Sequence, residues 1–172
     1  MRLFHVSEEA DITVFHPRLP TRTDLDPAVG LVWAIDEARL PNFLTPRDCP
    51  RVTYHIGENT TEADSARFLT AGFSHAVILE EDWRERMRHT VLTLYEMDPA
   101  DFVLQDPVAG YYVAKTTQIP VAVYTVTDPL AELHRRKVLV CFVENLWPLA
   151  ESIQKSSLNW SLCRMKNAKG NP

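Results

Sequence analysis

The sequence of this 172-residue chain predicts an α+β fold with a largely antiparallel or mixed sheet and flanking helices. Short runs of β-branched and aromatic residues, bounded by Pro, Asp or Gly, are typical of strands. Segments with capping residues and apolar stripes predict helices among them. The strands come in runs, without the regular strand–helix–strand alternation of a parallel sheet, and this grouping favours the α+β class.

The length and composition predict one domain. A chain of this length can build one good hydrophobic core, and its 45% apolar and 24% charged residues are typical of a globular protein. We expect a single globular domain over residues 1–164 and a frayed, disordered polar tail over 165–172.

The first half of the chain predicts three strands and two helices. The strands are expected at 3–6, 30–36 and 51–56, with a short helix or turn at 37–44. Helices are expected at 60–72, where Thr61 and Asp64 form a capping-box pattern and Gly72 can close the helix, and at 80–89.

The second half is richer in strands. Four are expected, at 90–97, 110–116, 120–127 and 138–144. Asp128 before Pro129 is a typical N-cap for a helix over 130–137, whose basic residues lie at its far end, where the helix dipole favours them. A last helix is expected over 145–157.

Charge and cysteine usage exclude several classes of protein. A net charge of −5 argues against general nucleic-acid binding and against an anionic membrane surface. The sequence has no apolar stretch long enough to span a bilayer and no signal peptide. Its cysteines, Cys49, Cys141 and Cys163, are odd in number and widely spaced, which is typical of reduced thiols. We therefore expect a cytoplasmic protein.

The common catalytic and metal-binding motifs do not occur in the sequence. With five glycines it has no P-loop and no G-x-G-x-x-G, and it also lacks H-E-x-x-H and G-x-S-x-G. The six histidines never fall four residues apart on an expected helix, so we expect no metal site.

Arginines are concentrated between residues 18 and 51, near Trp33 and Tyr54. Guanidinium groups bind phosphates bidentately and aromatic faces stack on flat rings, so this set suits a nucleotide with a pyrophosphate. The alternative is that these arginines pair with neighbouring acids on a solvated surface. The set comprises Arg18, Arg22, Arg39, Arg47 and Arg51.

The opening segment "LFHVSEEADITVFHPR" and the following "VWAID" resemble the N-terminal half of the ADP-ribosyltransferase-like fold. The pattern is similar to the rifampicin ADP-ribosyltransferases and the RNA 2′-phosphotransferases. In that family a first-strand histidine holds a ribose of NAD, and the resemblance implies this role for His5, with Ser7 beside it. A family tyrosine stacks on nicotinamide, and Trp33 stands at its place.

The resemblance continues in "LYEMDPADF" followed by "GYYVAKTTQIPVAVYTV". It implies that the third-motif acid corresponds to Asp98 or Asp101. Many members carry a glutamate where this chain has Gly110-Tyr111-Tyr112, and the following family residues are also replaced. The chain as a whole also resembles a small bacterial protein family that implies no activity.

The chemistry of ADP-ribosyl transfer matches several of these residues. A cationic ribosyl centre forms as nicotinamide leaves, so the site needs a ribose-orienting group, an aromatic wall and a carboxylate. His5, Trp33 and one of Glu96, Asp98 or Asp101 have that chemistry, and Arg18 would clamp the pyrophosphate. NAD would be the co-substrate, with an acceptor that the sequence does not identify.

Two other functions fit the same residues. Without the third-motif glutamate the chain could be a non-catalytic binder of a nucleotide or small ligand. It could also be a ligand-free interaction module, for example a homodimer through its strand-rich second half or through the region of Trp147 and Trp160. In that case His5 and Trp33 are core residues and Asp98-Pro99 is a turn.

Overall fold

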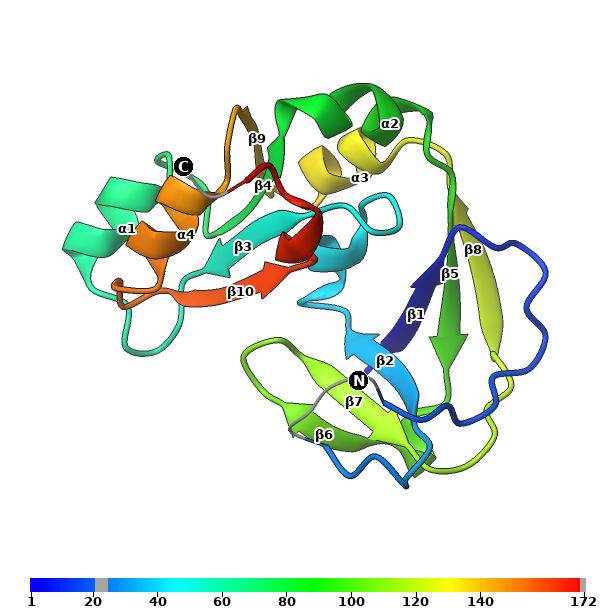
Figure 1. The fold of residues 1–172 in the computed structure, drawn as a ribbon. Coiled ribbons are helices and arrows are strands. Elements are labelled where there is room, and N and C mark those ends of the chain that lie inside the picture. The colour runs from blue at the N-terminus through cyan, green and yellow to red at the C-terminus, as the bar shows by residue number, and fades with distance from the viewer. Residues whose placement is uncertain (21–24, 171–172) are drawn as a thin grey trace. The chain divides into compact units, whose positions relative to one another are not determined.

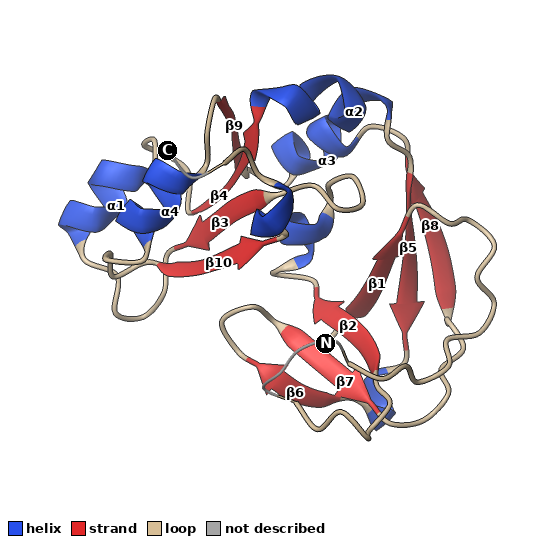
Figure 2. Cartoon of the chain, viewed as in Figure 1, coloured by secondary structure: helices blue, strands red, loops and turns tan. Residues whose placement is uncertain are grey.

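The computed structural model describes residues 1–20 and 25–170 and divides them into two compact units. The first unit combines Met1–Phe43 with Leu92–Val126, and the second combines Leu44–Val91 with Thr127–Pro172. One unit contains an antiparallel sheet and the other a mixed sheet with helices (Figures 1 and 2), so the predicted α+β class is confirmed. The single domain over 1–164 stays a prediction.

The first unit is built on an antiparallel sheet with the strand order β6-β7-β2-β1-β5-β8. The first two strands along the chain, β1 and β2, lie at its centre (Figure 1), so the opening segment of the sequence is covered by neighbours on both sides. Its strands are β1 (Leu3–Ser7), β2 (Val32–Asp36), β5 (Leu92–Met97), β6 (Val103–Asp106), β7 (Tyr111–Ala114) and β8 (Ala122–Val126), with 3-10 turns η1 (Leu40–Phe43) and η3 (Pro99–Asp101).

One face of this sheet carries the core of the first unit. Strand alternation sends Leu3, Tyr95 and Met97 to the same face, since β1 and β5 pair Leu3 with Met97 and His5 with Tyr95. Phe15, from the segment after β1, packs onto this face. The cluster consists of Leu3, Phe15, Val32, Ala34, Tyr95, Met97, Phe102 and Ala114. We call this surface the His5 face, because His5 shares it.

The second unit is built on a mixed sheet with the strand order β10-β3-β4-β9. Only β4 and β9 are parallel, with Ala76 opposite Leu139 and Glu80 opposite Val143. Every residue of β3 and β4 is buried, as expected for strands covered on both faces. The strands are β3 (Arg51–His55), β4 (His75–Glu80), β9 (Leu139–Val143) and β10 (Asn159–Cys163).

Helices pack on the mixed sheet. The helices α1 (Glu62–Phe68) and α4 (Trp147–Ile153) lie side by side (Figure 1), and Leu146, Ala150 and Ile153 pack against β3 and β4. The helices α2 (Arg84–His89) and α3 (Pro129–Arg135) contact each other, and Arg84 lies over Phe142 of β9, 4.0 Å from the ring centroid. Cys141 and Val143 pack on the face of the sheet that α4 covers. Phe142 lies between them along β9 and so points to the opposite face, which α2 covers.

The predicted caps are confirmed at the start of two helices. Thr61 accepts a hydrogen bond from the Asp64 amide at 3.2 Å, and Asp128 accepts one from the Ala131 amide at 2.9 Å. Gly72 has a positive φ of 92° but lies beyond the end of α1, which closes at Leu69 in extended geometry. The carboxylate of Asp64 binds Ser157 instead of completing the capping box.

Three strands were not expected. β4 reads "HAVILE", a continuous apolar run without alternation, because both of its faces are covered. β6 reads "VLQD" and is exposed, and β10 reads "NWSLC" at the end of the segment after α4. For β6 and β10 the partner strands, more than the local sequence, determine the extended conformation, whereas the apolar run of β4 was a usable signal for a buried strand.

Residues 165–170 fall in the segment expected to be a polar tail. They include the 3-10 turn η4 (Met165–Asn167), and the carbonyl of Lys169 accepts a hydrogen bond from the Trp147 indole at 2.8 Å. The Lys169 amide donates to the buried carboxylate of Glu80 at 3.1 Å. Residues 171–172 of the expected tail lie outside the described residues.

Candidate functional site

His5 lies at the centre of β1 and is fixed by the neighbouring strand. Its Nδ1 lies 3.0 Å from the carbonyl oxygen of Trp33 on β2. A carbonyl can only accept, so Nδ1 carries the proton and donates it. In the neutral imidazole Nε2 then holds a lone pair, which can accept a hydrogen bond from a hydroxyl group.

The surroundings of His5 favour the neutral form of its imidazole. Burial lowers the pKa of His5 below its ordinary value, and the cation of Arg18 lowers it further. The hydrogen bond to Trp33 and the carboxylate of Glu9 act in the opposite direction but do not overcome the burial. The charges of Arg18 and Glu9 therefore both act on the imidazole of His5.

The segment after β1 is held over the His5 face by Tyr95. The buried Tyr95 hydroxyl donates to the carbonyl of Glu9 at 2.6 Å and accepts from the amide of Ile12 at 3.1 Å. Ser7, two residues after His5 on the same strand, accepts from the Glu9 amide at 3.0 Å. Ser7 thus lies on the His5 face, as expected, and its oxygen helps to turn the chain.

Asp101 belongs to a polar cluster linked to this face through Phe15. The Phe15 ring lies 4.7 Å from the His5 ring, and its backbone pairs with Gln118. The Asp101 carboxylate accepts from the Thr116 hydroxyl at 2.9 Å and from the Gln118 amide group at 3.3 Å. Gln118 also donates to Thr116 at 2.8 Å. The Asp101 carboxylate is exposed, and these hydrogen bonds hold it in one orientation.

Trp33 does not share the His5 face. Ala34 and Val32 pack in the cluster with Tyr95, so the alternation of β2 sends the Trp33 side chain to the opposite face. There it meets Tyr111 edge to face, with 5.3 Å between ring centroids. The structure joins His5 to the backbone of Trp33, but does not bring its indole to the imidazole.

The two other acids take structural roles. Asp98 caps η3, accepting from the Ala100 amide at 3.0 Å, which is the turn function considered for this Asp-Pro pair. Glu96 accepts two hydrogen bonds from Arg2, each at 2.8 Å, and one from the Tyr124 hydroxyl at 2.9 Å. These bonds lower the pKa of Glu96 to about 2. Glu96 pairs with Ala122 and Phe4, on the face opposite His5.

The arginines of the 18–51 segment are divided between the two units. Arg18 is close to His5, while Arg39 donates to the carbonyl of Val108 at 3.2 Å. In the second unit Arg51 is buried and donates to the Cys49 carbonyl at 2.9 Å, and Arg47 is exposed. Arg22 lies outside the described residues. Arg18 is therefore the arginine of this segment whose charge acts on His5.

The second unit carries buried polar groups that maintain the fold. Glu80, 1% exposed, accepts from the amides of Leu146 and Lys169 and so joins α4 to the C-terminal segment. Burial raises the pKa of Cys49 to about 12, although Arg51 and Arg86 act in the opposite direction, and its thiol is not a ready nucleophile. Over residues 1–20 and 25–170 no cluster of three metal-ligating side chains is found.

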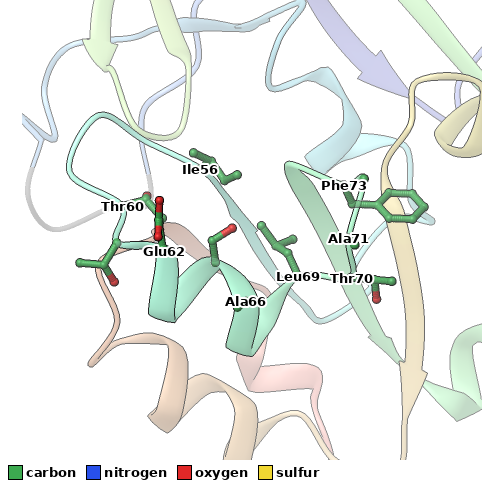
Figure 3. A pocket seen from close by; sticks show the side chains of 11 residues that line it. Ile56, Thr60, Glu62, Ala66, Leu69, Thr70, Ala71 and Phe73 are labelled. Carbon is green, nitrogen blue, oxygen red and sulfur yellow. The ribbon is translucent and has the colours of Figure 1, made fainter.

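A shallow, open hollow lies beside α1 in the second unit (Figure 3). It has a volume of about 530 Å³ and is lined by apolar and hydroxyl side chains from α1 and from the loop after it, with Glu62 as its acid. Open hollows of this kind lack the converging polar groups of a ligand site. None of the predicted site residues lies in it.

Three residues of the site were not expected from the sequence: Phe15, Tyr95 and Gln118. The alternation of Thr93, Tyr95 and Met97 was a usable signal, because it places Tyr95 on one face with two other residues of β5. Phe15 and Gln118 lie outside the named strands and meet through an isolated bridge, which no local pattern reveals.

Together these observations describe an α+β protein whose candidate site is His5, on one face of an antiparallel sheet, with the charges of Arg18 and Glu9 acting on it. The chain belongs to a protein family of unknown function, DUF6886, whose sequence model matches residues 4–168. Comparison with curated proteins and comparison with solved structures gave no match. Among the described residues, no helix has both the length and the apolar character needed to cross a membrane.

Proposed function

We propose that the His5 face of the first unit binds NAD and transfers its ADP-ribosyl group to an acceptor. The observation that carries this proposal is the state of His5. Its Nδ1 is bonded to the Trp33 carbonyl, its imidazole is neutral, and Arg18 lies within electrostatic range. A ribose hydroxyl can donate to Nε2 while the guanidinium group binds a phosphate oxygen.

The transfer step breaks the bond between the ribose C1′ and the nicotinamide nitrogen. The electron pair leaves with nicotinamide, the acceptor forms the new bond to C1′, and the acceptor's proton passes to a base. In the proposal Asp101 stabilises the positive charge that develops on the ribosyl centre. Thr116 and Gln118 support this role, because their hydrogen bonds orient the Asp101 carboxylate before any ligand binds.

The proposal gives Trp33 no contact with the ribose that His5 holds. The Trp33 indole lies on the other face of the sheet, where it packs against Tyr111. Its backbone still matters, since the Trp33 carbonyl fixes the tautomer of His5. The family resemblance implies that nicotinamide stacks on the Trp33 side chain. Binding measurements can test this role independently of the role of His5.

The test is a calorimetric titration of the full chain with NAD, combined with an assay for nicotinamide release. We expect saturable binding that is lost in His5→Ala and weakened at least tenfold in Arg18→Ala. Arg47→Ala is the matched control, because Arg47 is an exposed arginine of the second unit. Trp33→Leu, which removes the aromatic face, is expected to bind like the wild type; a loss of binding there, with the fold intact, would restore the stacking role.

Asp101→Asn separates the enzyme from a non-catalytic nucleotide binder. The enzyme predicts that this variant binds NAD but no longer releases nicotinamide. A pure binder shows no nicotinamide release even in the wild type, since binding does not need a carboxylate at the ribose. No binding by a folded wild type at millimolar NAD would reject the NAD-dependent enzyme and leave a ligand-free interaction module or a binder of a different ligand.

A further inference from the structure

The two edges of the antiparallel sheet in the first unit are protected to different degrees. β6 and β8 are its outermost strands, and each pairs with one neighbour in the described chain. An edge strand presents unpaired backbone groups to any second strand, and natural proteins usually blunt such edges with charges, bulges or short strands. The features of each edge therefore indicate whether another strand is excluded or accepted.

The β6 edge has such protection. Its pairing with β7 is irregular between Leu104 and Asp106, where the register shifts. The carboxylate of Asp106 then ends the strand by accepting from the amides of Val108 and Ala109, each at 3.0 Å. An irregular strand of four residues with a terminal acid is a poor template for a second chain.

Within the strand itself, the β8 edge has neither a charge nor a bulge, and its one proline, Pro120, precedes the strand. From Ile119 to Thr127 the sequence "IPVAVYTVT" contains no charged residue. Several of its large apolar side chains are exposed: Ile119 at 67%, Val121 at 63%, Val123 at 52% and Tyr124 at 43%. The register of β8 on β5 is regular from Ala122 to Val126. An exposed, regular, uncharged strand of this kind is a site for strand addition.

We propose that a second copy of this chain pairs antiparallel along β8 and extends the sheet across a two-fold axis. The strand's own charge pattern identifies the occupant. A two-fold axis places β8 of one copy against β8 of the other. Each chain carries a net charge of −5, but because β8 itself is uncharged, the two strands do not repel each other. An acidic or basic peptide would find no opposite charge between Ile119 and Thr127.

The side chains of this strand also suit pairing with themselves. Val121, Val123 and Thr125 lie on one face of β8, since Val123 and Thr125 pair with Tyr95 and Thr93 of β5. An antiparallel partner sets β-branched residues opposite β-branched residues there, which is a favourable cross-strand combination. One added strand covers less area than a standard interface of ~1,600 Å². We therefore expect a weak dimer that dissociates on dilution.

Sedimentation velocity on the full chain, from low micromolar to near-millimolar concentration, tests the proposal. We expect the wild type to shift from monomer to dimer across this range. Val123→Lys and, as a second variant on the same face, Thr125→Lys should remain monomeric, because lysine on an edge strand disfavours pairing. Val103→Lys is the matched control, since Val103 is 68% exposed on the β6 edge, and this variant should dimerise like the wild type.

Circular dichroism confirms that each variant is folded before its mass is interpreted. A wild type that stays monomeric at the highest concentration overturns the proposal and leaves β8 to a different partner. A dimer that survives both β8 substitutions, or one that Val103→Lys abolishes, also overturns it, since the contact then lies elsewhere.

Discussion

The two units of this chain use their buried polar groups differently. In the second unit Glu80 and Arg51 are buried and bond to backbone groups, so their polarity stabilises the fold. In the first unit His5 uses Nδ1 for the backbone of Trp33, while Arg18 and Glu9 act on its charge from nearby side chains. All three groups therefore bond to backbone atoms, and His5 differs in being an imidazole whose second nitrogen, Nε2, can accept a hydrogen bond.

The comparison predicts that substitutions in the two units have opposite consequences. Loss of a buried group in the second unit should reduce stability and leave NAD binding intact. Loss of His5 should remove NAD binding and leave most of the stability. The predictions below test this division, beginning with the largest expected effect.

Glu80→Ala should lower the free energy of unfolding by about 2–4 kcal/mol, because it leaves the amides of Leu146 and Lys169 without their acceptor. Urea unfolding measures this effect. Glu144→Ala is the matched control, since the Glu144 side chain is 83% exposed and should contribute little. Equal losses in the two variants would show that the Glu80 bonds do not join α4 to the C-terminal segment.

Tyr95→Phe should cost about 1–2 kcal/mol and release the segment over the His5 face, because one buried hydroxyl holds both Glu9 and Ile12. Amide hydrogen exchange should become faster at residues 9–12, and NAD binding should weaken. Tyr124→Phe removes an exposed hydroxyl bonded to Glu96 and serves as the control. Unchanged exchange at residues 9–12 would contradict the positioning role of Tyr95.

The lowered pKa of His5 makes stability depend on pH just below the ordinary histidine value of 6.5. In that range the unfolded chain binds more protons than the folded chain, so stability falls as the pH decreases through it. His5→Phe should flatten this part of the stability profile. NAD affinity of the wild type should decrease at lower pH still, as the pH falls through the lowered pKa of folded His5, because a protonated Nε2 can no longer accept. A profile that His5→Phe leaves unchanged would assign the effect to other histidines.

The contribution of Glu96 to stability should change with pH only in acid. Its pKa lies near 2, below the ordinary value of 4.5, because Arg2 and Tyr124 donate to its carboxylate. Its contribution is present above the ordinary value and is lost as the pH falls through the folded value. Glu96→Gln should therefore make the acid limb of a stability profile shallower while leaving NAD binding at neutral pH unchanged. A loss of binding would place Glu96 in the site.

Some parts of this protein follow from local sequence alone. The caps at Thr61 and Asp128 were predicted and are confirmed, because an N-cap depends on residues within one turn. The α+β class also followed from the grouping of strand-like and helix-like segments. His5 and Ser7 share one face because side chains alternate along a strand, wherever the strand is placed.

Tertiary structure alone decided the rest. β6 and β10 are strands because partners distant in sequence pair with them. Trp33 is adjacent to His5 through its backbone yet points to the other face, since the register of β2 on β1 determines which side chains meet. Arg18 and Asp101 reach the region of His5 through isolated contacts of Arg18, Phe15 and Gln118. Such contacts depend on the closure of long loops, which local patterns do not encode.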